Sequence, residues 1–176
     1  MSSGFTSTAC GPPWSTHSDG RVMERRRIKR ARNGTYQLRL PDVERDILRG
    51  LPAQLRELLA RDDPSTRRLF PPAYVDDPEH EAEYRRLMGQ DLLEGRRQAL
   101  VLVEQTVDAE VLDEGQLTAW MGALNDLRLV LGTRLDVSEA MDLEALPDDD
   151  PETPLFALYG YLGFLQEQVV AALAGW

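Results

Sequence analysis

Apolar residues recur every three or four positions in three long segments of the chain. These segments cover residues 42–59, 84–103 and 117–135, and their spacing predicts amphipathic helices. A fourth segment, 155–165, carries no charge and is apolar on every side. Because a helix that is apolar all round belongs in a protein interior, we expect the final helix, 153–173, to be the buried centre of a compact, mainly α-helical bundle.

Two of these helices contain residues that shape the prediction. Gly50 and Pro52 interrupt the first segment, so it is predicted to form two short helices, with Pro52 at the start of the second. One long helix is predicted from residue 78 to residue 107. Its expected buried stripe comprises Tyr84, Leu87, Met88, Leu92, Gly95, Ala99, Leu102 and Val103.

Glycines in two of the helices predict a close contact. Gly95 and Ala99 leave a shallow groove on the long helix, and Gly160 and Gly163 narrow the final helix. We therefore expect the two helices to approach each other at these positions.

The pattern before the helices is that of a β-hairpin. Asn33-Gly34 separates two runs with partial alternation of apolar and polar residues. This dipeptide favours the positive φ values of a type I′ turn, so residues 26–40 are predicted to form a small N-terminal hairpin. A lone hairpin is marginally stable in water, so its apolar side must pack on the helices. The apolar residues are Ile28, Tyr36, Leu38 and Leu40.

The connector between residues 64 and 78 holds the first candidate interaction residues. Its four prolines oppose regular structure, yet its apolar residues predict an ordered loop packed across the bundle. Arg67 and Arg68, followed by Phe70 and Tyr74, form a group that can pair with an acidic or phosphorylated protein. In the alternative interpretation the two arginines cap a helix end within the same molecule.

The composition of the chain indicates a cellular compartment and a boundary between a tail and a folded domain. The chain has 176 residues and a single cysteine, Cys10, which fits a reducing cytoplasm. No segment has the pattern of a signal peptide or a membrane span. Residues 1–22 are predicted to be a disordered tail and residues 23–176 a single helical domain. A natural start at Met23 is an alternative, in which the tail does not belong to the protein.

Charge is distributed unevenly along the chain. The net charge is −10, but residues 23–39 carry seven basic residues against Glu24, which gives +6. This basic strip is the second candidate interaction site, suited to phosphate or acidic protein surfaces, and its alternative interpretation is a solvated, charge-protected strand edge. Its candidate residues are Arg25, Arg26, Arg27, Lys29, Arg30 and Arg32.

Candidate chemistry is sparse. No nucleophile–base pair or glycine-rich phosphate loop is present, so the sequence predicts no catalytic residue, no cofactor site and no enzyme. His80 lies near Asp76, Asp77 and Glu83, but acidic residues at a helix start are expected from the helix dipole alone. No metal site is predicted.

Four segments carry a resemblance to a known family. They are residues 68–87, which include Phe70-Pro-Pro-Ala-Tyr74, then Asp91-Leu92 with Arg96 and Arg97, then Trp120 with 125–135, and finally 158–167. Together they resemble an actinobacterial domain-of-unknown-function family, DUF2017, across residues 26–175. Genes of this family often lie beside that of the Clp protease adaptor, and some members are labelled transcriptional regulators. The resemblance implies no catalytic residues.

We therefore expect an uncharacterised, non-enzymatic cytoplasmic protein that acts as a protein-interaction adaptor or regulator. The resemblance implies the Clp protease adaptor or a neighbouring gene product as the protein partner. The alternative is a transcriptional regulator or other nucleic-acid binder that acts through the basic hairpin; the strongly acidic remainder of the chain opposes it. No membrane partner is expected.

Overall fold

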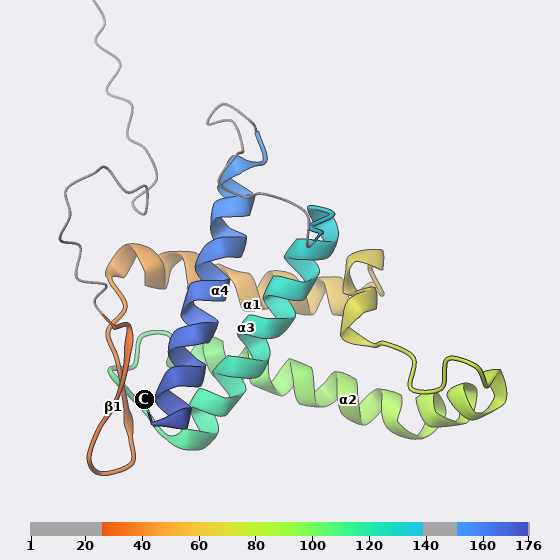
Figure 1. Ribbon diagram of the computed structural model, residues 1–176, viewed down its shortest axis with the longest axis horizontal. Helices are drawn as coiled ribbons and strands as arrows, with labels where there is room; N and C mark the ends of the chain where they lie inside the picture. Colours follow the sequence, from red (N-terminus) through yellow and green to blue (C-terminus); the bar gives the residue numbers. More distant parts are fainter. Residues whose placement is uncertain (1–25, 139–150, 176) are drawn as a thin grey trace, which may run out of the picture.

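A computed structural model describes residues 26–138 and 151–175 of the chain, so the predicted tail lies outside the described residues. The fold is mainly α-helical with a small antiparallel sheet, as predicted (Figure 1). Its strands are β1 (Ile28–Arg30), β2 (Tyr36–Leu38) and β3 (Val111–Leu112), and its helices are α1 (Asp42–Ala60), the 3-10 helix η1 (Pro64–Leu69), α2 (Pro78–Thr106), α3 (Glu114–Arg134) and α4 (Thr153–Ala174).

Helix α3 is the centre of the molecule. It contacts α4, α2, η1 and α1, and it buries residues on several of its faces, including Trp120, Ala123, Asp126 and Val130. Its start is fixed by a capping box, in which Asp113 and Gln116 bond each other's backbone N–H groups. The hydrophobic core gathers around this helix.

The predicted placement of the final helix at the centre is wrong. Helix α4 packs along α3 (Figure 1) and touches β1, but its residues Leu155 and Val170 are exposed. The close glycine contact is also elsewhere. A Cβ on Gly132 of α3 would lie 3.0 Å from the Tyr159 ring, whereas a Cβ on Gly95 or Gly160 would meet no atom within 4 Å. The apolar composition of α4 explains why it packs against α3. The central position, where the other helices meet, belongs to α3.

Helix α1 is continuous, so the prediction of two short helices is wrong. Pro52 lies inside the helix and is buried together with Leu48, Leu55 and Leu59 on one face. An interior proline costs about 3 kcal/mol or more, because it removes one helical hydrogen bond and crowds the preceding turn. Burying each leucine contributes about 1.5–3 kcal/mol, so the shared apolar face outweighs the proline.

The hairpin forms where the sequence predicts it, and its apolar side chains are buried against the helices. Its turn differs from the prediction. Gly34 has a φ of 82°, and it is the only hairpin residue with positive φ. The N–H of Gly34 donates to the Ala31 carbonyl, and the N–H of Ala31 donates to the Thr35 carbonyl. The turn is therefore of type I, followed by a bulge at Gly34.

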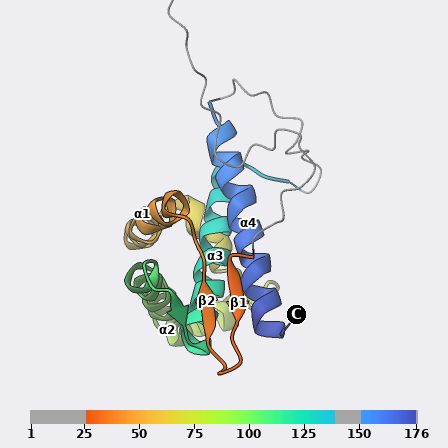
Figure 2. The ribbon, with the colours of Figure 1, turned by 90° about the vertical axis from the view of Figure 1, so that its left-hand side faces the viewer.

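A third strand completes the sheet, which the sequence did not predict. The order is β1-β2-β3, with Tyr36 opposite Leu112. Figure 2 shows the hairpin lying beside α4. The sheet therefore connects the hairpin to the turn between α2 and α3.

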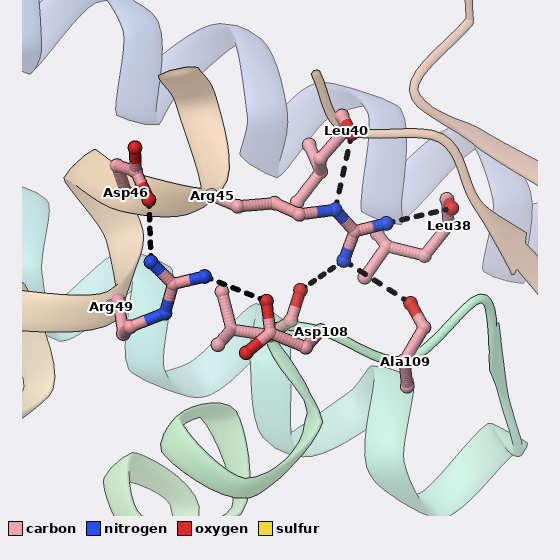
Figure 3. Close-up of polar contacts among 8 residues, drawn as sticks. Leu38, Leu40, Arg45, Asp46, Arg49, Asp108 and Ala109 are labelled. Carbon is pink, nitrogen blue, oxygen red and sulfur yellow. Dashed lines mark hydrogen bonds and ion pairs between the residues drawn. The ribbon is translucent and has the colours of Figure 1, made fainter. Parts of the chain in front are cut away.

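Arg45 of α1 fastens this turn to the hairpin (Figure 3). Its guanidinium donates to the carbonyls of Val107 and Ala109, which follow the end of α2. It also donates to the carbonyl of Leu38 in β2 and to that of Leu40 just after the strand. The last carbonyls of a helix have no partner within the helix, so a cation there satisfies them and complements the helix dipole. Nearby, Arg49 pairs with Asp108 at 2.8 Å, which adds a second link between α1 and the same turn.

Candidate functional site

The candidate site is a projecting arm, which we define as the loop 70–77 together with the first half of α2, residues 78–95. Buried residues of α2 lie only in its second half: Leu100, Val103 and Thr106. Figure 1 shows the loop and the first half of α2 extending away from α3 and α4. The arm therefore has solvent where the sequence predicted a core.

Apolar side chains are exposed along this arm. It contributes five of the nine large apolar residues that are exposed among the described residues. Their exposed fractions are 48% for Tyr74, 78% for Val75, 57% for Leu87, 41% for Met88 and 40% for Leu92. The prediction that Leu87, Met88 and Leu92 belong to the buried stripe is wrong. The helical spacing was read correctly, but no element of the described fold covers it.

Local hydrogen bonds hold the loop on the helix. The carboxylate of Asp77 accepts the backbone N–H of His80 and so caps α2. The carboxylate of Glu81 accepts the N–H groups of Ala73 and Tyr74, at 2.8 and 2.9 Å. These backbone bonds lower the pKa of Glu81, with a further contribution from Arg85. The ring of Tyr74 lies edge-on to that of Tyr84, with centroids 6.1 Å apart.

Arg96 anchors the base of the arm. Its guanidinium donates to the Asp126 carboxylate of α3 and to the Leu69 carbonyl of η1, and it lies over the Phe70 ring at 5.3 Å from the centroid. Asp126 is only 2% exposed, and this burial raises its pKa although Arg96 opposes the rise. One side chain thus joins α2, α3, η1 and the start of the loop.

The sequence-predicted residues of the connector fall into different environments. Phe70 is half-buried under Arg96, whereas Tyr74 is exposed on the arm. Arg67 and Arg68 lie exposed in the last turn of η1. Within the described residues neither arginine side chain forms an ion pair.

The basic hairpin forms a second surface at a distance from the arm. Lys29, Arg30 and Arg32 are exposed and form no ion pair within residues 26–138 and 151–175. Arg26 is also exposed, and Arg25 lies outside the described residues. The surface therefore presents several cations next to an acidic body.

Arg27 is a structural member of this strip. It forms a two-pronged ion pair with Glu44 of α1, and the same carboxylate accepts the Tyr161 hydroxyl of α4 at 2.9 Å. Burial raises the pKa of Tyr161, and the negative charge of Glu44 adds to the rise. Arg27 thus ties the hairpin to two helices, because its guanidinium is turned inward.

His80, the one histidine considered as a metal ligand, contacts a neighbouring carboxylate. The His80 ring lies 2.5 Å from Asp77. Within the described ranges, no three histidine, cysteine or acidic side chains gather as a metal site would require. None of the described helices is both long and apolar enough to cross a membrane.

One feature of the sequence, the length of α2, indicated that an arm projects from the fold. Helix α2 has 29 residues, against 19 for α1, 21 for α3 and 22 for α4. At about 1.5 Å per residue, it is roughly 10 Å longer than the others, so one end must extend past its neighbours. Periodicity alone cannot show which end does so. The anchor residues Arg96 and Asp126 carry no signal of their pairing in a single sequence.

The fold and these surfaces define a class: a small, mainly helical protein that presents an anchored apolar arm and a basic hairpin. The chain belongs to the family described as a domain of unknown function, DUF2017, whose family model matches residues 24–173.

Curated relatives carry a regulatory name. The chain is 33% identical over 130 residues to the protein named oxidative stress regulator AosR in Mycobacterium tuberculosis and in Mycobacterium bovis. The match covers 64% of this chain and 59% of each relative, so the chain spans less than two thirds of their length. No solved structure matches the chain.

Proposed function

We propose that this protein is a non-enzymatic cytoplasmic regulator that acts by binding another protein through the projecting arm. Its curated relatives are named as oxidative stress regulators, which supports a regulatory role. The observation that carries the mode of action is the concentration of exposed apolar side chains on the arm. Contiguous exposed apolar surface on a folded protein marks a contact site.

The composition and stiffness of the arm favour a protein as its ligand. Tyrosine and methionine, here Tyr74 and Met88, are enriched at protein interfaces. The Glu81 and Asp77 hydrogen bonds fix the loop on the helix, and Arg96 fixes the base. A surface that is ordered before binding loses less conformational entropy when the partner arrives.

The proposal is tested by complementation in a strain that lacks the native gene. We expect Leu87→Glu with Met88→Glu to fail to restore survival under peroxide stress, because two buried charges would be forced into the contact. Val170→Glu is the matched control, since Val170 is equally exposed but lies on α4, and it should restore survival. Equal protein levels must be shown by immunoblot. Full survival of cells with the double variant would refute the role of the arm.

The first partner to examine is the Clp protease adaptor. This choice rests on the gene neighbourhood that the family resemblance implies. Purified adaptor and this protein should associate in a pull-down that Leu87→Glu with Met88→Glu abolishes. Absence of association would remove this partner and leave other proteins as candidates for the arm.

A second candidate function is nucleic-acid binding by the hairpin. It is favoured by the exposure of Lys29, Arg30 and Arg32, and opposed by the net charge of −10. A gel-shift titration decides the matter at moderate salt. Binding that disappears in the charge-reversed variant Lys29→Glu, Arg30→Glu, Arg32→Glu would support this function. No shift at micromolar protein would exclude the hairpin as a nucleic-acid site.

A further inference from the structure

We infer that the arm pairs with the arm of a second copy of this chain, antiparallel and about a two-fold axis near Met88. This inference rests on the proposed role of the arm as a protein interface and names the protein that occupies it. Three features of the arm support this pairing: the symmetry of its apolar stripe, the distribution of charge along the helix, and its open position.

The apolar stripe is symmetric about its middle residue. Tyr84 lies four positions before Met88 and Leu92 lies four positions after it, so the three share one helical face. When two such helices run antiparallel, Met88 meets its own copy and Tyr84 meets Leu92 of the second chain. A two-fold interface of this kind needs only one self-complementary surface, and it is the commonest arrangement in homodimers.

The charges of the arm are complementary when the helices run antiparallel. Residues 76–83 hold five acidic residues and no arginine or lysine, a net −5, counted from Asp76, Asp77, Glu79, Glu81 and Glu83. Residues 85–97 hold four arginines against Asp91 and Glu94, a net +2. With the axis at Met88, antiparallel pairing sets residues 76–83, net −5, beside residues 93–100 of the second copy, where Arg96 and Arg97 against Glu94 give a net +1. Parallel pairing sets −5 beside −5. Antiparallel helix dipoles favour the same orientation.

The arm is placed where a second copy can reach it. Figure 1 shows its free end beyond the other helices, so a second arm can lie alongside. Val75, the most exposed large apolar residue described, sits in the loop at this free end, together with Tyr74. These side chains extend the apolar surface beyond the helix and enlarge the area that the second copy covers.

The mass of the purified full-length protein in solution tests dimer formation. Light scattering over a concentration series should give twice the chain mass of 19.9 kDa for the wild type and for Val170→Glu, and the single-chain mass for Leu87→Glu with Met88→Glu. Circular dichroism must show unchanged helix content in both variants. A wild type that stays at 19.9 kDa at the highest concentration would overturn the inference.

A charge-swap experiment tests the charge pairing between the two arms. The first variant, Asp76→Lys, Glu79→Lys, Glu83→Lys, changes residues 76–83 from −5 to +1; the second, Arg86→Glu, Arg97→Glu, changes residues 85–97 from +2 to −2. Each variant alone should be monomeric, because like charges then meet. Their mixture should form heterodimers, seen by native mass spectrometry. Homodimers of either variant, or no heterodimer, would overturn the antiparallel pairing.

The two proposals fail in distinguishable ways. If the wild type is monomeric but the arm variant still loses complementation, the dimer is wrong and the arm contacts a different protein. If the wild type is dimeric but the arm variant complements fully, the dimer is right and the regulatory role of the arm is wrong.

Discussion

At the residue scale, single polar contacts in the core join elements that are distant in the sequence. Trp120 of α3 is fully buried, and its indole N–H donates to the Thr106 hydroxyl at the end of α2, at 2.8 Å. Arg96 and Arg45 play comparable roles at the two ends of the packed half of α2. Each contact satisfies a group that would otherwise be buried without a partner.

We predict that Thr106→Val lowers the free energy of unfolding by about 1–3 kcal/mol, because it leaves the buried Trp120 N–H without an acceptor while keeping the side-chain shape. Thr118→Val is the control, since the Thr118 hydroxyl bonds the Glu114 carbonyl on an exposed face of α3. That control should change stability by less than about 0.5 kcal/mol. Urea denaturation measures both, and equal effects would contradict the assignment.

The pH dependence of stability tests the burial of Asp126. Burial raises its pKa, so the folded state disfavours its ionisation relative to the unfolded chain. The wild type should therefore lose stability relative to Asp126→Asn as the pH rises from about 4 to about 7, across the range where an aspartate of raised pKa ionises. Other carboxylates titrate alike in both proteins and cancel in the difference. The opposite trend would mean that pairing with Arg96 outweighs burial.

At the element scale, sequence patterns located most helices and strands but not all their relations. The start of α2 at residue 78 was predicted correctly, because a helix start depends on neighbouring residues, here Pro78 and the Asp77 cap. The continuity of α1 through Pro52 depends on a shared buried face, and β3 is a strand only because β2 lies beside it. Contacts between distant segments decide such cases, and no local pattern contains them.

The packing of α3 against α4 predicts that alanine substitutions at two glycines change the stability of the protein in opposite directions. Gly132→Ala should destabilise the protein by about 1 kcal/mol or more, because the new Cβ would lie 3.0 Å from the Tyr159 ring, over which the Arg128 guanidinium also lies. Gly160→Ala should stabilise it by about 0.5–1 kcal/mol, since that Cβ meets no atom within 4 Å and alanine favours a helix.

Thermal unfolding of the two alanine variants provides the measurement. The melting temperature should fall for Gly132→Ala and rise for Gly160→Ala. A fall for both would show that Gly160 also lies in a tight contact, in disagreement with the packing of α4.

At the scale of the whole molecule, the arm separates what the sequence could predict from what it could not. The stripe from Tyr84 to Leu92 was identified by its spacing, but whether it faces a core or solvent depends on how far α2 extends beyond its neighbours. The basic hairpin was predicted correctly as an element, yet only the structure separates the inward Arg27 from the exposed Lys29 and Arg30. Exposure is a property of the assembled fold. The sequence therefore predicted the elements that carry the candidate sites, but not which of their side chains are exposed.

The most direct test of the account is affinity capture from cells that natively express the protein, with three tagged chains compared. These are the wild type, the arm variant Leu87→Glu with Met88→Glu, and the hairpin variant Lys29→Glu, Arg30→Glu, Arg32→Glu. We predict that the wild type and the hairpin variant retain the same proteins, including the untagged second copy, and that the arm variant loses them. Retention by the arm variant together with loss by the hairpin variant would contradict the account.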